Sequence, residues 1–210
     1  MGCDIHVLVE VLRRGKWEVE IPVGNDDRFA KFREPGELMV PWWTFHRNYD
    51  SFALMANVRN NGDTVPIDEP RGLPADVTAE AARELAFGGD LHSHSWLMLS
   101  EIKKALNPKK KIREAGIMSE ADFKQWREKK IAPDSYCQGI GGGGIKVVSG
   151  DEMVDIWEGR ANRHLQMQYQ VRASWERPVR QGAGELFRFM KRIEKLGTGN
   201  KVRVVFAFDN

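Results

Sequence analysis

The fold class follows from the stretch CDIHVLVEV at residues 3–11, in which apolar and polar side chains largely alternate. Alternation with a period of two predicts a β-strand whose faces meet different surroundings. Asp4, His6 and Glu10 fall on one face of this strand, and Cys3, Ile5, Val7, Val9 and Val11 fall on the other. A polar turn at residues 13–16 leads into a second strand at 17–21, so a hairpin is expected at the start of the chain.

Further strand patterns come late in the chain and helix patterns come in the middle. Residues 164–175 alternate as in a half-solvated antiparallel strand, and 145–148 and 202–209 also favour strands. Helix caps and apolar spacing predict helices over 51–58, 79–87, 95–106, from 119 onward and over 185–196. We therefore expect a single α+β domain over 1–210, with a helical segment around 76–130 between N- and C-terminal strands. Its sheet is expected to be mainly antiparallel, with helices packed on one side.

Composition limits the function classes. A chain of 210 residues with 41% hydrophobic residues can bury a core without disulfides or a structural metal. A formal net charge of +2 gives no strong signal for duplex nucleic acid. No apolar run approaches the roughly 18 residues of a membrane span, and the two cysteines lack a Cys-x-x-Cys spacing. We expect a cytoplasmic protein with free thiols and no membrane partner.

The most concentrated chemical signal is the string Asp90-Leu91-His92-Ser93-His94-Ser95. Two histidines in a His-x-His spacing place both imidazoles on one side of an extended segment, where a divalent ion can meet two nitrogens. Over these six residues the chain resembles the first motif of the polymerase-and-histidinol-phosphatase phosphoesterases. The barrel and the further ligands of that family have no counterpart here, and hydrogen bonds by which His92 and His94 cap the following helix explain the same pattern.

Asp4 and His6 form the second signal, because a carboxylate two residues away on the same strand face can orient an imidazole. Asp and His on a solvated strand face explain the same pattern, and this is the favoured interpretation if helices cover the other face of the sheet. If the two signals converge, Asp4, His6, His92 and His94 supply enough ligands for one divalent metal, the cofactor that this pattern suggests. His6, His92 and His94 are then the candidate catalytic residues.

A third group suits a nucleotide-like ligand. Guanidinium groups match phosphate oxygens, amides read polar edges and aromatic rings stack on bases. The same aromatic residues can instead belong to the core, and the same arginines can form salt bridges at its rim. The candidate ligand-binding residues are Arg47, Asn48, Tyr49, Arg59, Asn60, Arg71, Trp42 and Trp43.

Five separated blocks resemble a family of uncharacterised bacteriophage proteins, in the same order along nearly the whole chain. They are residues 1–6, 47–60, 71–74, 92–97 and 204–210. The resemblance implies a phage origin and carries over no established activity. These blocks contain the polar clusters described above, so the resemblance favours their forming one site.

Two functions fit these observations. The first is a hydrolase of a nucleotide or phosphodiester substrate in the host cytoplasm, with or without a metal. The second is a non-catalytic anti-defence protein that sequesters a host nucleotide signal or binds a host protein. The expected partner is therefore a small nucleotide-like ligand or a host protein. Turnover of nucleotides distinguishes the two functions.

Overall fold

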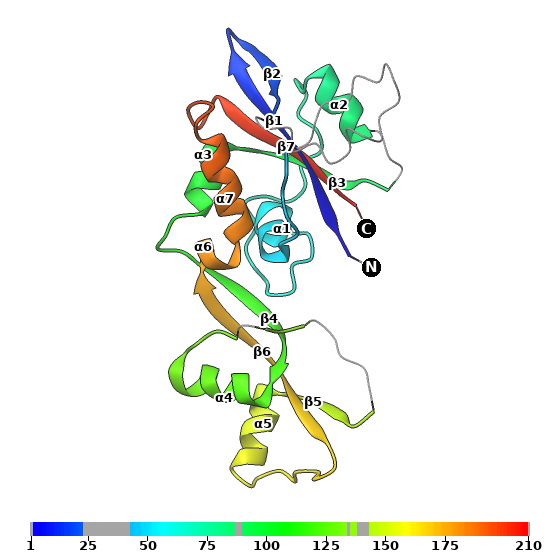
Figure 1. The fold of residues 1–210 in the computed structure, drawn as a ribbon, viewed down its shortest axis with the longest axis vertical. Coiled ribbons are helices and arrows are strands. Elements are labelled where there is room, and N and C mark those ends of the chain that lie inside the picture. Colours follow the sequence, from blue (N-terminus) through cyan, green and yellow to red (C-terminus); the bar gives the residue numbers. More distant parts are fainter. Residues whose placement is uncertain (1, 23–42, 87–89, 134, 138–142, 210) are drawn as a thin grey trace. The chain divides into compact units, whose positions relative to one another are not determined.

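The computed structural model describes residues 2–22, 43–86, 90–133, 135–137 and 143–209. Its elements, in chain order, are β1 (Asp4–Arg13), β2 (Lys16–Glu20), α1 (Tyr49–Ala56), α2 (Ala79–Ala86), β3 (His92–Met98), α3 (Leu99–Ala105), β4 (Lys111–Ser119), α4 (Glu120–Lys129), β5 (Ile145–Ser149), α5 (Gly150–Trp157), β6 (Gln168–Pro178), α6 (Val179–Gly182), α7 (Gly184–Ile193) and β7 (Val202–Asp209). Figure 1 shows them along the chain.

The elements form two sheets, and the contacts group the chain into two compact units. The larger unit comprises Met1–Asn60, Val65–Lys110 and Val179–Asn210, and the smaller unit comprises Asn61–Thr64 and Lys111–Pro178. The predicted α+β class with mainly antiparallel strands is confirmed. The expectation that residues 1–210 fold as one domain stays a prediction.

The larger unit contains a four-stranded antiparallel sheet in the order β2-β1-β7-β3 (Figure 1). The predicted hairpin is confirmed as β1 and β2, with Arg13 opposite Lys16. The predicted final strand is confirmed, with its ends at Val202 and Asp209. It lies between β1 and β3, so its side chains are buried from Val202 to Phe208.

Helices cover both faces of this sheet, rather than the one face expected. On one face Leu8 and Val205 pack with Ala81 and Leu85 of α2. On the other face Phe52 of α1 contacts Phe208 edge-on, at 5.1 Å between ring centroids. Aromatic contacts from Phe45 continue this core to Phe189 of α7. Burial on both faces explains why β7 is almost entirely apolar.

The smaller unit has its own sheet and core. Strand β6 pairs antiparallel with β4 and parallel with β5. Helices α4 and α5 pack on this sheet through a cluster of buried side chains. The cluster comprises Met118, Phe123, Val148, Met153, Ile156, Tyr169, Val171 and Trp175.

The segment 76–130 is less helical than expected, because it contains the strands β3 and β4. The helix expected from Ser95 begins only at Leu99, since residues 92–98 pair with β7 instead. Strand β6 lies four residues later than the expected start at 164. Ser119 Oγ accepts the backbone N–H of Asp122 at 3.0 Å and begins α4 as predicted, whereas the helix expected from residue 51 begins at Tyr49, after the cap Asn48.

Within the described part of the chain, no helix is long and apolar enough to cross a membrane. The thiols of Cys3 and Cys137 are both free, as the spacing of the two residues predicted.

Candidate functional site

The N-terminal cluster, defined as Asp4, His6, Arg47 and Asp209, lies where β1 begins and β7 ends. The pairing of these strands places Asp4 opposite Asp209. Arg47 binds Asp4 in two-point geometry, with Nε 3.0 Å from Oδ1 and Nη2 2.6 Å from Oδ2. Its guanidinium lies over the backbone of Gly2, where a Cβ would clash. The structure therefore brings Asp4 and Arg47 together as an ion pair.

The hydrogen-bond partner of His6 comes from the last strand, β7, and not from His92 or His94. Nε2 of His6 lies 2.8 Å from Oδ2 of Asp209, whose Oδ1 accepts the backbone N–H of Asp4 at 2.9 Å. Burial opposes ionisation of Asp209, but the hydrogen bonds from His6 and Asp4 outweigh it, helped by the charges of His6 and Arg47. The pKa of this carboxyl is consequently below its ordinary value. The other ring nitrogen of His6, Nδ1, is buried.

His92 and His94 flank a β-bulge and have separate partners. Ser93 between them has a positive φ of 52°, and the register of β3 against β7 shifts between His92 and Ser95. His92 stacks on Phe208, its Nδ1 lies 3.0 Å from Ser93 Oγ, and its buried Nε2 has no partner among the described residues. His94 Nε2 donates to the carbonyl of Leu85 at 2.8 Å.

The proposed metal ligands Asp4, His6, His92 and His94 are thus engaged with different partners. Over the described ranges, no group of three or more His, Cys, Asp and Glu side chains is placed to hold a metal ion. The four residues belong to one end of the same sheet, but the structure does not bring them together as ligands.

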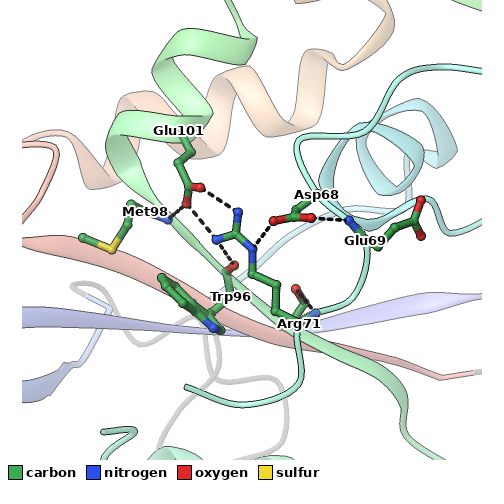
Figure 2. Close-up of polar contacts among 7 residues, drawn as sticks. Asp68, Glu69, Arg71, Trp96, Met98 and Glu101 are labelled. Carbon is green, nitrogen blue, oxygen red and sulfur yellow. Dashed lines mark hydrogen bonds and ion pairs between the residues drawn. The ribbon is translucent and has the colours of Figure 1, made fainter. Parts of the chain in front are cut away.

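Arg71 joins three segments of the larger unit (Figure 2). Its guanidinium donates to both oxygens of Glu101, at 2.7 and 3.1 Å, and to Asp68 at 2.6 Å. It also reaches the carbonyl of Trp96 at 3.3 Å and lies over that indole ring. These contacts lower the pKa of Asp68, and they lower the pKa of Glu101 although burial opposes this. Arg71 is therefore engaged in holding a loop against β3 and α3.

Four other predicted ligand-binding residues hold the ends of α1. Asn48 caps the helix, since its Oδ1 accepts the Ser51 N–H at 2.8 Å, and its Nδ2 donates to Gly182 at 3.1 Å. The Tyr49 hydroxyl accepts the N–H of Cys3 at 3.3 Å. Beyond the helix, Asn60 donates to Asn57 at 2.7 Å. Arg59 hydrogen-bonds the buried Cys3 thiol; burial nevertheless raises the pKa of that thiol.

The two tryptophans proposed as stacking faces do not supply a platform in the described structure. Trp42 lies outside the described residues. Trp43 is 7% exposed, and its indole N–H donates to the carbonyl of Glu20 at 2.8 Å. It contacts Phe189 edge-on and lies under the guanidinium of Arg192. Trp43 is a core residue, which was the alternative interpretation of this position.

A pocket of about 490 Å³ lies in the smaller unit and is called here the α4 pocket. All of its lining residues come from β4, from β6 and from the C-terminal part of α4 with its cap. The lining that bears on ligand chemistry consists of Lys111, Arg113, Trp126, Lys130, Trp175 and Glu176. Cations and indole rings therefore line one pocket.

The cations of the α4 pocket differ in their partners. Lys111 Nζ lies 3.1 Å from Glu176, and both side chains are exposed. Arg113 donates to the neutral hydroxyl of Ser174 at 3.1 Å. Lys130 lies over the ring of Trp126, with Nζ 5.5 Å from the centroid. One of these cations is thus matched by a carboxylate, and two are bound to neutral groups.

The Trp175 side chain, which borders the α4 pocket, is fixed by contacts with Glu114 and Tyr136. Its indole N–H donates to the buried carboxylate of Glu114 at 2.5 Å, and Glu114 also pairs with Arg177 at 2.8 Å. Tyr136 contacts the same indole edge-on, with 4.8 Å between centroids. These contacts give the pocket a wall of defined orientation before any ligand binds.

The α4 pocket was not among the sites predicted from the sequence. One signal was available: Trp126 and Lys130 are four residues apart, which places them as neighbours on a helix. Their meeting with Lys111 and Arg113 depends on the packing of α4 with β4, which the spacing does not reveal.

Comparison of the chain with protein-family models, with curated proteins and with solved structures gives no match in any of the three. Functional conclusions therefore rest on the geometry of the chain itself.

Proposed function

We propose that the protein binds a nucleotide-like ligand, a planar ring that carries an anionic group, and that it does so without converting the ligand. The observation that carries this proposal is the α4 pocket, in which three cations and the half-buried indole of Trp126 face one space, and the buried Trp175 forms part of the wall. The resemblance to bacteriophage proteins adds a biological setting: sequestration of a host nucleotide signal in the host cytoplasm.

The size and lining of the α4 pocket suit such a ligand. A volume of about 490 Å³ falls in the range of about 300–1,000 Å³ that is typical of small-molecule sites. Lysine and arginine side chains bind phosphate oxygens, and an indole face stacks on any base. Trp126 is half-buried, so its ring has a surface from which a ligand can exclude water.

Binding is favoured over catalysis because the α4 pocket lacks an acid–base pair. Its lining holds no imidazole, and its one carboxylate, Glu176, is paired with Lys111. Ser174 is the hydroxyl in the lining, and it accepts from Arg113 rather than donating to a base. These groups can hold an anion, but none of them is arranged to activate a nucleophile.

Hydrolysis is the second candidate, and one observation favours it. The ion pair of His6 with Asp209, at 2.8 Å, is the arrangement that orients an imidazole for acid–base work, and Arg47 lies in the same cluster. Against this, the second nitrogen of His6 is buried. Nucleotide turnover that disappears in His6→Ala would replace the binding proposal with this one.

The proposal is tested by titrating the full chain with linear and cyclic nucleotides in a calorimeter and by chromatography of the ligands afterwards. We expect saturable binding and unchanged ligand. Trp126→Ala should weaken binding about tenfold or more, because stacking contributes about 1–3 kcal/mol per base.

Trp157→Ala is the matched control for this titration. Trp157 is a half-exposed indole of the same unit that packs on Phe123 and does not line the α4 pocket. Affinity within about twofold of the unaltered chain is expected. Equal losses in the two variants would show that the pocket is not the binding site, and absence of binding to every nucleotide would refute the proposal.

A further inference from the structure

The lining of the α4 pocket contains more cations than carboxylates. Lys111 pairs with Glu176, whereas Arg113 and Lys130 form no ion pair with any described residue. An exposed ion pair such as that of Lys111 exchanges easily for another anion. The lining therefore carries three cations and one carboxylate, Glu176, which pairs with Lys111 and lies opposite Arg113 in the pairing of β4 with β6. An excess of two positive charges is available to a ligand.

Lys130 occupies an unusual backbone position for a lysine. It is the C-cap of α4, with φ 58° and ψ 27°, in the left-handed region where glycine or asparagine is favoured. Its N–H closes the last turn on the carbonyl of Trp126, and its ammonium lies over the Trp126 ring.

Two unmatched cations distinguish between the two kinds of phosphate found in nucleotides. A terminal phosphate monoester carries a charge of about −1.5 to −2 at pH 7, and a phosphodiester carries about −1. The Coulomb gain grows with the product of the charges, so the monoester gains more from Arg113 and Lys130. It also offers three oxygens to the cations, which a diester does not.

We infer that the ligand of the α4 pocket is a mononucleotide with a terminal phosphate, rather than a cyclic or internally esterified nucleotide. This inference rests on the proposed function. The phosphate lies between Arg113 and Lys130, and Lys111 contributes a third contact. By drawing the ammonium of Lys130 off the Trp126 ring, the phosphate uncovers the indole face on which the base stacks. Binding of the phosphate and stacking of the base are therefore coupled. The contact of the Lys130 ammonium with the Trp126 ring, which is lost on binding, is exposed and therefore weak.

The test compares three ligands with one base: the nucleoside, its 3′,5′-cyclic monophosphate and its 5′-monophosphate, each titrated calorimetrically into the full chain. We expect the 5′-monophosphate to bind about tenfold more tightly than the cyclic form. In Lys130→Asn this preference should shrink to about threefold or less. Asparagine tolerates the left-handed backbone, so the end of α4 and the melting temperature should be preserved.

Lys129→Asn is the matched control, because Lys129 is the exposed preceding residue and does not line the α4 pocket. It should keep the full preference for the 5′-monophosphate. Equal or tighter binding of the cyclic nucleotide, or a preference that survives in Lys130→Asn, would overturn this inference and leave the proposed function standing. Absence of binding to all three ligands would overturn the proposed function itself.

Discussion

In the larger unit charged side chains are bound to one another, whereas around the α4 pocket of the smaller unit positive charge is left over. Asp4 pairs with Arg47 and His6 with Asp209, while Arg113 donates to the Ser174 hydroxyl and Lys130 lies over the Trp126 ring. Paired charges join strands and loops, and unmatched charges are available to a ligand. Charged side chains that lack an ion-pair partner therefore indicate a ligand site better than a large number of polar residues does.

The larger unit also contains an ion pair that is almost completely buried. Arg203 and Glu10 lie opposite each other on β7 and β1, and Nε of Arg203 is 2.6 Å from a carboxylate oxygen of Glu10. Their side chains are 3% and 0% exposed. Arg203 also pairs with Asp76 and lies over the ring of Trp17.

The largest expected effect comes from breaking this pair. Arg203→Ala leaves the Glu10 carboxylate buried without its cation, so the free energy of unfolding should fall by about 3–5 kcal/mol in urea titrations. Replacing both partners, as Glu10→Leu with Arg203→Met, should recover much of the loss. A loss below about 1 kcal/mol in Arg203→Ala would contradict a structural role for the pair.

The second prediction concerns Glu114, whose buried carboxylate pairs with Arg177 and also orients Trp175 at the α4 pocket. Glu114→Gln removes the charge opposite Arg177 and weakens the hydrogen bond that orients Trp175, so stability should fall by about 1–3 kcal/mol. Nucleotide affinity should fall severalfold with it. Chemical denaturation and calorimetry measure the two quantities.

Glu176→Gln is the control for this variant, because Glu176 is exposed and borders the same pocket. Its removal should leave stability unchanged and raise nucleotide affinity slightly, since one negative charge is lost from the lining. A weaker affinity in Glu176→Gln would mean that the carboxylate contacts the ligand directly.

A smaller effect is expected at Arg71, which the sequence suggested as a ligand-binding residue. Lysine cannot reproduce the two-point contact with Glu101, so Arg71→Lys should cost about 1–2 kcal/mol of stability. Nucleotide affinity should not change. Arg83→Lys, at an exposed position on α2, should alter neither quantity; reduced affinity in Arg71→Lys alone would return Arg71 to the ligand site.

The smallest effect concerns pH. The pKa of Asp209 is lowered in the folded chain, so its contribution is present above the unfolded value of about 3.9 and is lost as the pH falls through the folded value. The unfolding free energy should therefore fall more between pH 5 and pH 3 in the unaltered chain than in Asp209→Asn, by about 1 kcal/mol or less. Parallel pH profiles of the two proteins would exclude this linkage.

The sequence by itself determined the local structure wherever neighbours along the chain carry the signal. The strand pattern of residues 202–209 correctly predicted β7 at Val202–Asp209, and the serine at 119 correctly marked the start of α4. The common face of Asp4, His6 and Glu10 also followed from the period of a strand. Periodicity failed at residues 95–98, where an apolar spacing compatible with a helix was overridden by pairing with β7.

Only the tertiary structure decided which side chains form contacts within the fold and which remain available to a ligand. His6 meets Asp209, which is 203 positions later in the chain, and Trp43 is buried against Phe189. The α4 pocket brings together residues from three separate segments, at 111–113, 126–130 and 174–176. The physical reason is that burial and charge pairing depend on contacts between distant segments, whereas periods and caps depend on neighbours along the chain.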